Sequence, residues 1–173
     1  MNFGLIKPID SANGPGVRVS LFVSGCRHQC PGCFNSQAWD FEFGEKFTDE
    51  QIHQILTYLD HEYISGLTFL GGDPMEPENQ GMVYEVISEV RKKFGHSKTI
   101  WLYTGATYES LVDQENRYWT PYLEDILKNI DVLVDGPFIE AKKDLGLRFR
   151  GSYNQRLIDM PKTLETNKIC LFE

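Results

Sequence analysis

The sequence predicts an α/β fold with a mainly parallel sheet, built from short strands that alternate with helices. Three features predict it: β-branched apolar runs of strand length, amphipathic stretches of helix length between them, and glycine turns directly after the strands. A βα unit takes about 30 residues, so a chain of 173 residues holds about five or six units. That is too few for a closed eightfold barrel. We therefore expect one domain over residues 1–173, with an open, partial (β/α) barrel.

The first half of the chain contains two predicted strands with a helix between them. The strand at 17–23, VRVSLFV, is rich in β-branched residues and runs directly into a loop with three cysteines. In the helix at 48–60, apolar residues recur at i, i+3, i+4 and i+7 behind a capping-box pair, Thr48 and Gln51. The next strand ends in the glycine-rich turn 71–74, GGDP.

The middle of the chain continues this alternation. We expect a helix over about 79–94, with Asn79 as a possible N-cap and inward apolar residues at helical spacing. A strand follows at 99–103, TIWLY, and ends before a glycine. The pair Thr120-Pro121 then predicts an N-cap and first position of a further helix.

The last part of the chain is less regular. An apolar strand is predicted at 131–136, again ending in glycine. Residues 148–160 are mostly polar and predict a loop. A final strand is expected at 168–173, in which Cys170 would be a small buried side chain.

The carboxyl ends of parallel strands meet at one edge of a sheet, where chemistry usually gathers. In this chain those ends are the cysteine loop, Gly71-Gly72-Asp73-Pro74, Thr104-Gly105 and Asp135-Gly136. We therefore expect a single active site at this rim.

Composition excludes several function classes. The net charge of −8 and the pI near 5.0 argue against general affinity for nucleic acid or an anionic membrane. No stretch approaches the roughly 20 apolar residues that a membrane span needs. The first residues lack the pattern of a signal peptide. We expect a cytoplasmic, reducing location, where clustered cysteines bind metal or catalyse more often than they form disulfides.

Three of the four cysteines lie within eight positions, in 24–35, SGCRHQCPGCFN. Thiolates at Cys26, Cys30 and Cys33 suit three corners of a [4Fe–4S] cube, whose fourth iron then lacks a protein ligand. The alternative is a zinc site of three cysteines and one histidine, because His28 lies between the first two cysteines. The spacing favours the cluster but leaves both interpretations open.

With its other motifs, the chain resembles the radical S-adenosylmethionine (SAM) superfamily, and within it the activating proteins of anaerobic (class III) ribonucleotide reductase. The resemblance lies in a C-x3-C-x2-C loop after the first strand and a Gly-Gly-acidic turn after the next. It extends over nearly the whole chain, in the segments 12-ANGPGVR-18, 21-LFVSGCRHQCPGCFN-35, 66-GLTFLGGDPMEPEN-79, 101-WLYTG-105, 132-VLVDGPF-138 and 150-RGSYNQR-156.

The resemblance implies a radical-SAM type of partial barrel and a defined chemistry. SAM would chelate the open iron through its methionyl amine and carboxylate, and one electron from the cluster would cleave it to a 5′-deoxyadenosyl radical. That radical would take a hydrogen atom from a backbone glycine of the large catalytic subunit of the reductase. A flavodoxin or ferredoxin type of protein would supply the electron. The cofactor carries the difficult chemistry, and the protein orients it.

The resemblance also assigns residues. Cys26, Cys30 and Cys33 would be the cluster ligands, and Gly71-Gly72-Asp73 would receive the methionyl amine. Asp73 has the alternative role of folding the turn by an Asx hydrogen bond.

Adenine would lie near Gly32 and Phe34, although Phe34 as plain core packing remains an alternative. Thr104 and Asp135 would hold ribose or methionyl groups, or simply cap strand ends. Arg150 or Arg156, or else backbone, would pair with the SAM carboxylate. The polar segment that holds Arg148, Arg150 and Arg156 would dock the reductase or bind SAM.

Two rival functions remain open. An activase of a different glycyl-radical enzyme would share the cysteines and the glycine turn, although such activases are often longer and carry more cysteines. A non-enzymatic zinc-binding docking module would explain three cysteines and one histidine. It would not explain glycine turns at successive strand ends.

Overall fold

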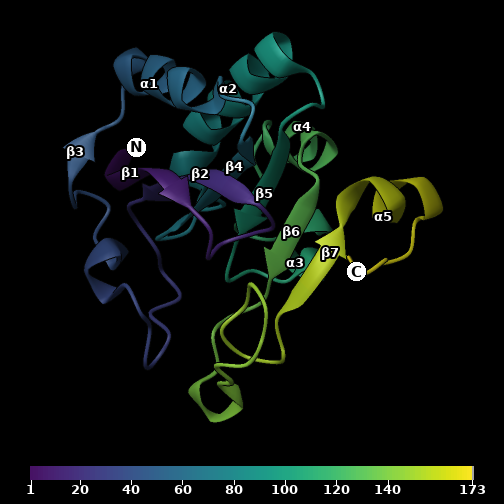
Figure 1. Cartoon of the computed structure of the whole chain (residues 1–173). Coiled ribbons are helices and arrows are strands. Elements are labelled where there is room, and N and C mark those ends of the chain that lie inside the picture. The colour runs from purple at the N-terminus through teal and green to yellow at the C-terminus, as the bar shows by residue number, and fades with distance from the viewer. Residues whose placement is uncertain (173) are drawn as a thin grey trace.

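The strands form one open, mixed sheet (Figure 1). The structure, a computed structural model, describes residues 1–172. Across these residues the sheet has seven strands in the order β3-β1-β2-β4-β5-β6-β7. The strands are β1 (Asn2–Asp10), β2 (Val17–Val23), β3 (Glu45–Lys46), β4 (Ile64–Gly71), β5 (Thr99–Tyr103), β6 (Val132–Asp135) and β7 (Arg156–Asp159).

The centre of the sheet is parallel and its edges are antiparallel. Strands β2, β4, β5 and β6 pair in parallel, whereas β1, β3 and β7 run antiparallel to their neighbours. Within residues 1–172, four parallel strands are therefore fewer than the five or six βα units expected. The expected number of βα units was too high because segments near both ends of the chain form antiparallel edge strands instead. The α/β class and the open sheet are confirmed.

Helices cover one face of the sheet, and Figure 1 shows α1, α2 and α4 gathered on that side. Their apolar residues share one core with inward residues of the parallel strands, such as Leu21, Phe69 and Leu102. The helices are α1 (Asp49–Leu59), α2 (Pro77–Phe94), α3 (Tyr108–Val112), α4 (Leu123–Asn129) and α5 (Met160–Thr166), with short 3-10 turns η1 (Ser36–Trp39) and η2 (Glu140–Lys142).

The opposite, helix-free face of the sheet carries a buried arginine and a small aromatic cluster. The Arg18 guanidinium donates to Thr68 Oγ1 at 2.8 Å and to the Thr99 carbonyl at 2.9 Å, and it lies over the Trp101 ring. Trp101 also meets Phe149 and Phe172 edge-on. Loops rather than helices therefore cover this face and leave room for a pocket.

The predicted helix starts are partly confirmed. The Thr48–Gln51 capping box is present at the start of α1. Helix α2 begins at Pro77, two residues before the predicted N-cap, because proline fits the first helical position without losing a hydrogen bond. Asn79 lies inside the helix and points into the protein. Among residues 1–172, no helix is long and apolar enough to cross a membrane.

Predictions for the last third of the chain needed correction. Helix α4 begins at Leu123, because the Thr120 hydroxyl instead donates to Gln80. The segment expected as a loop contains β7, whose short length gives no clear alternation. The expected final strand is reduced to a bridge between Ile158 and Leu171, and its last residue, Glu173, lies outside the described residues. Cys170 is half-buried and belongs to no strand.

Candidate active site

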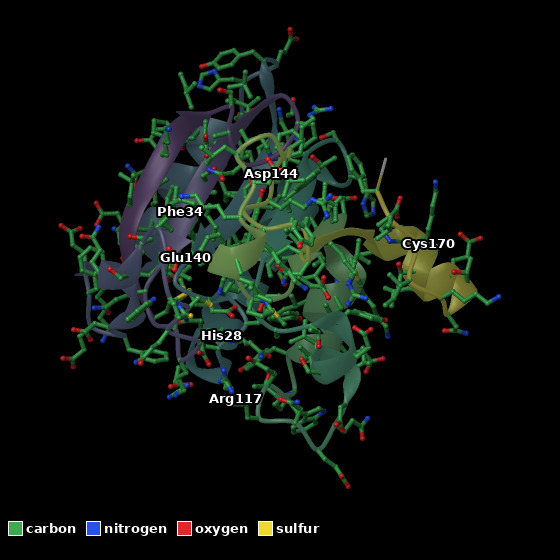
Figure 2. The ribbon with its side chains drawn as sticks, turned by 90° about the horizontal axis from the view of Figure 1, so that it is seen from below. His28, Phe34, Arg117, Glu140, Asp144 and Cys170 are labelled. Atoms are coloured by element: carbon green, nitrogen blue, oxygen red, sulfur yellow. The ribbon has the colours of Figure 1, made fainter. Side chains whose placement is uncertain are left out.

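The segments that follow the four parallel strands meet around one pocket of about 510 Å³. Figure 2, viewed from below, shows His28, Phe34, Glu140 and Asp144 on this side of the molecule and Cys170 well away from it. The structure brings together these predicted residues: Cys26, Cys30, Cys33, Phe34, Gly71, Gly72, Asp73 and Thr104. Gly32 lies in the same loop but does not line the pocket.

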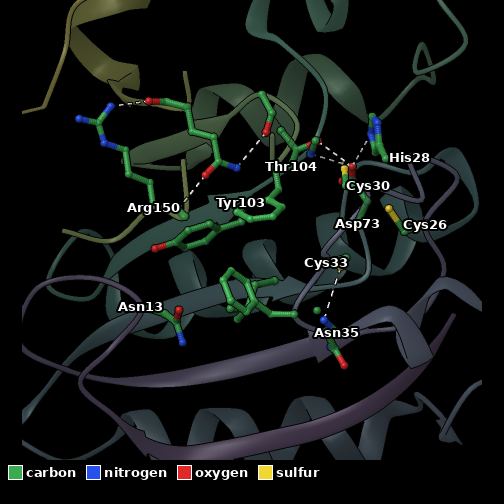
Figure 3. A pocket seen from close by; sticks show the side chains of 18 of the residues that line it. Asn13, Cys26, His28, Cys30, Cys33, Asn35, Asp73, Tyr103, Thr104 and Arg150 are labelled. Atoms are coloured by element: carbon green, nitrogen blue, oxygen red, sulfur yellow. Dashed lines mark hydrogen bonds and ion pairs between the residues drawn. The ribbon is translucent and has the colours of Figure 1, made fainter. Parts of the chain in front are cut away.

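The pocket extends from the cysteine loop along the helix-free face of the sheet (Figure 3). Strand side chains Phe22, Leu70 and Tyr103 form its floor, and Asn13 and Phe149 approach from loops. The Tyr103 hydroxyl donates to the Phe149 carbonyl at 2.6 Å, which ties the 144–151 loop to the sheet. Tyr103 had no predicted role, although side chains alternate along a strand and Tyr103, one residue after the core residue Leu102, must face the other side of the sheet.

The cysteine loop keeps three free thiols half-buried at one end of the pocket. Burial, followed by the nearby carboxylates Asp73 and Glu76, raises the pKa of Cys26 to about 12. Burial also raises the pKa of Cys30. At neutral pH the thiols of Cys26 and Cys30 therefore hold their protons, and metal binding at these two residues must release them.

The donors around the cysteine loop do not form a ready-made site for a single metal ion. Within residues 1–172, no three His, Cys, Asp or Glu side chains come close enough to hold a single metal ion. A zinc ion with bonds of about 2.3 Å to sulfur needs thiolates packed tightly around one point. The larger [4Fe–4S] cube holds its thiolates farther apart and accepts three cysteines with one open corner.

His28, the histidine of the zinc alternative, is turned toward other partners. Its Nε2 lies 2.8 Å from the Tyr118 hydroxyl and 3.0 Å from Asp73 Oδ2. The Tyr118 hydroxyl and the Asp73 carboxylate thus both lie against Nε2. This arrangement disfavours His28 as a fourth ligand through that atom.

The glycine turn is packed directly against the cysteine loop. The Gly72 amide donates to the Val23 carbonyl at 2.7 Å, and the Asp73 amide donates to the Gly25 carbonyl at 2.8 Å. A Cβ added to Gly72 would lie 2.6 Å from the Gly25 carbonyl oxygen and 2.9 Å from that of Ala38. Gly71 has a φ of +110°, which favours glycine. The glycine turn and the cysteine loop are therefore held together as one unit by close packing and hydrogen bonds of their backbones.

Asp73 is a fully buried acceptor at the centre of this unit. Its Oδ1 accepts from the Met75 amide at 2.9 Å, which is the Asx hydrogen bond of the alternative prediction. Its Oδ2 accepts from Thr104 Oγ1 and from the Gly105 amide, each at 3.0 Å. The structure thus contains the hydrogen bonds of a turn-forming residue, which also joins the ends of β4 and β5.

The two remaining polar candidates have different surroundings. Thr104 lines the pocket, and its hydroxyl accepts from the Ala106 amide while it donates to Asp73. Asp135 lies outside this pocket and lines a neighbouring one. Its carboxylate is occupied by the Tyr108 amide and the Arg156 guanidinium. The structure does not bring Asp135 together with the cysteines.

The two candidate arginines, Arg150 and Arg156, also have different surroundings. Arg156 pairs with both Asp135 and Glu109, so its guanidinium is already bound. Arg150 lines the pocket and donates to the Gln155 carbonyl. Of the two, Arg150 is the cation that a ligand in the pocket can reach.

Phe34 is 69% exposed, so the alternative that it packs in the core is wrong. Its ring lies 5.2 Å from that of Phe138 at the pocket mouth. Gly32, with a φ of +76°, lets the loop turn just before Cys33.

Sequence reasoning missed two side chains that brace the site. Asn79 Nδ2 donates to the Ser24 and Asp73 carbonyls, both at 3.0 Å, and so clamps the cysteine loop to the glycine turn. Tyr118 reaches His28 from a loop 90 positions farther along the chain. No local pattern marks Tyr118, because its role depends on a contact between distant segments.

Comparison with known proteins shows the family of the chain. Residues 12–158 match a protein family described as a 4Fe-4S single cluster domain. The chain is 43% identical over 157 residues to the anaerobic ribonucleoside-triphosphate reductase-activating protein of Vibrio cholerae, covering 90% of this chain and 96% of that protein.

Two further proteins of the same name are similar over most of their length. The one from Enterobacteria phage T4 is 40% identical over 159 residues, with 91% of this chain and 93% of that protein covered. The one from Escherichia coli K12 is 37% identical over 157 residues, with 90% and 96% covered. The chain therefore belongs to the family of anaerobic ribonucleoside-triphosphate reductase-activating proteins.

Proposed function

We propose that this chain is a radical-SAM activase, which generates a glycyl radical on the large catalytic subunit of an anaerobic ribonucleoside-triphosphate reductase. The observation that carries the proposal is the set of three free cysteines, Cys26, Cys30 and Cys33, that line one pocket beside the glycine turn. Its relatives are named as activators of that reductase. We further propose that the curved sheet is the open partial barrel of the radical-SAM type.

In this proposal Cys26, Cys30 and Cys33 hold three irons of a [4Fe–4S] cluster and leave one corner open. When bound, the reduced cluster supplies the electron that cleaves SAM and so starts hydrogen abstraction from the target glycine. The backbone of Gly71 and Gly72 receives the methionyl amine, and a Cβ at either position would meet the backbone of the neighbouring strand or the cysteine loop.

Other groups would orient the rest of SAM. Gly32 and Phe34 would approach the adenine, Thr104 would hold a ribose or methionyl group, and Arg150 would pair with the carboxylate. Asp73 would act on SAM indirectly, since its oxygens already hold the turn and the end of β5. Asp135 would likewise support the site from outside the pocket, through Arg156.

The protein's own contribution is to position SAM and to exclude water. Phe22, Leu70, Tyr103 and Phe149 give the pocket an apolar wall beside the cysteines. The pocket has an open mouth, so we propose that the reductase completes it. SAM cleavage without the reductase should then be slow, and equal rates with and without it would contradict this step.

We propose a flavodoxin or ferredoxin type of electron donor, because the reaction needs one low-potential electron. We place the reaction in a reducing cytoplasm without oxygen, where the three thiols stay reduced.

An anaerobic assay tests the function. The purified chain is reconstituted with iron and sulfide, reduced with dithionite and supplied with SAM, and 5′-deoxyadenosine is measured. Cys30→Ala should abolish product and lower iron uptake. Cys170→Ala is the matched control, because Cys170 lies away from the site, and it should behave like the native chain. Bound zinc without iron, or product from the native chain no higher than from Cys30→Ala, would overturn the proposal.

A further inference from the structure

The segment between β6 and β7 differs in charge from the rest of the chain. Residues 137–156 contain five Lys or Arg and two Asp or Glu, a net charge of +3, in a chain whose net charge is −8. Two of the cations, Arg150 and Arg156, are bound to other groups of the protein. The other three are Lys142, Lys143 and Arg148.

These three cations lie over aromatic rings rather than beside carboxylates. Lys142 Nζ is 5.6 Å from the Tyr153 ring centre, Lys143 Nζ is 5.3 Å from that of Phe34, and Arg148 Cζ is 4.8 Å from that of Phe149. Within residues 1–172, none of the three has a carboxylate at ion-pair distance. Their charges are therefore not neutralised by the protein itself.

Large apolar side chains are exposed among these cations. Leu145 is 85% exposed, Phe34 69% and Tyr153 59%. Exposed aromatic and apolar groups next to an arginine are typical of protein–protein interfaces. We call this surface the cationic rim, and it consists of Phe34, Lys142, Lys143, Leu145, Arg148 and Tyr153.

The cationic rim stands at the mouth of the pocket. Phe34 and Leu145 are themselves pocket-lining residues, and Leu147, Phe149 and Arg150 of the same segment line it further in. Figure 2 shows Phe34, Glu140 and Asp144 on the side of the molecule that carries the pocket. A large substrate that places one residue in the pocket must therefore cover the rim.

We propose that the cationic rim is the docking surface for an acidic, apolar-rich segment of the reductase next to its target glycine. The inference rests on the proposed function and adds to it the chemistry of the partner's surface. A protein fits better than a nucleic acid or an anionic membrane, because the rest of this acidic chain repels an extended polyanion. Three free cations around exposed apolar side chains match a compact patch.

Charge reversal tests the proposal. Lys143→Glu/Arg148→Glu is compared with Lys92→Glu/Lys162→Glu, which has the same net charge but changes two exposed lysines outside the rim. Binding of each metal-free chain to the purified reductase is measured by fluorescence anisotropy at several salt concentrations. The rim variant should bind about tenfold more weakly than the control at low salt, and the difference should shrink as salt screens the charges.

Two further measurements separate this inference from the proposed function. Deoxyadenosine formation by reconstituted chain without reductase should be the same in both variants and the native chain, since none of the four substituted residues lines the pocket. If the native chain forms no deoxyadenosine, the proposed function fails whatever the binding result. If the rim variant binds the reductase as well as the control does, the docking inference is overturned. It is also overturned if charge reversal abolishes binding to duplex DNA or anionic vesicles but leaves reductase binding unchanged.

Discussion

The two sides of the pocket are built in opposite ways. On one side, the cysteine loop and the glycine turn are joined by backbone hydrogen bonds and by the buried side chains Asp73 and Asn79. On the other side, the cationic rim exposes Leu145 and leaves three cations without carboxylate partners among residues 1–172.

The difference matches what each side would hold under the two proposals above. A cluster and a small cofactor need fixed positions, because small errors in geometry cost large factors in rate. A protein surface needs exposed groups that adapt to a partner. The unfolding free energy of the metal-free chain in urea measures this contrast directly, since the fixed side should be sensitive to substitution and the rim should not.

Gly72→Ala should have the largest effect. The new Cβ would meet the carbonyl oxygens of Gly25 and Ala38, and neither can move without shifting the cysteine loop. We expect a loss of about 3 kcal/mol in unfolding free energy. Gly81→Ala is the control, because its Cβ would make only ordinary contact with Tyr122. In helix α2 that change should stabilise the chain by up to about 1 kcal/mol. Equal behaviour of the two variants would show that the turn is not tightly packed.

His28→Leu should have an intermediate effect. It removes the imidazole nitrogen that approaches Asp73 and Tyr118, both of which keep other partners, so we expect a loss of about 1 to 2 kcal/mol. In reconstituted protein, SAM affinity by calorimetry should fall about tenfold, because the turn is then held less firmly. His28→Gln keeps a donor near the same place and should restore most of both losses. If His28→Gln is no better than His28→Leu, the hydrogen bonds are not the reason for this histidine.

Leu145→Ser should have the smallest effect on folding. The side chain is 85% exposed, so unfolding free energy should change by less than about 0.5 kcal/mol. Reductase binding should nevertheless weaken, because an apolar contact at the rim is lost. Leu102→Ser, at a fully buried position on β5, shows what loss of a core side chain costs in the same measurement. A large destabilisation by Leu145→Ser would remove the distinction between the two sides.

The parallel strands, their helices and the part of the pocket formed by the cysteine loop were predictable from the sequence. Their signals are local: β-branched runs, helical spacing, and cysteines and glycines directly after strands. The edges were harder, because β1 and β7 need a neighbouring strand to define which side chains face inward. The number of parallel strands was overestimated for the same reason.

Contacts between distant segments were not predictable. Asp73 was recognised as part of the turn, but its bonds to Thr104 and Gly105 depend on β5 lying next to β4. The predicted topology put Asp135 at the same carboxyl edge of the parallel sheet. Its pairing with Arg156, from a segment expected to be a loop, accounts for its position outside the pocket. No local sequence pattern predicted the contact of Tyr118 with His28.

The anchoring of the 144–151 loop has a consequence for how such proteins diversify. The loop is held at its base by the bridge between Lys143 and Ser152 and by the hydrogen bond from Tyr103 to Phe149. Only the exposed positions of this loop, such as Leu145 and Arg148, can change freely in sequence, because Phe149 and Arg150 lie further in along the pocket. If the proposed docking holds, exchanging those exposed side chains, rather than the whole loop, is the natural way to redirect the chain to another target.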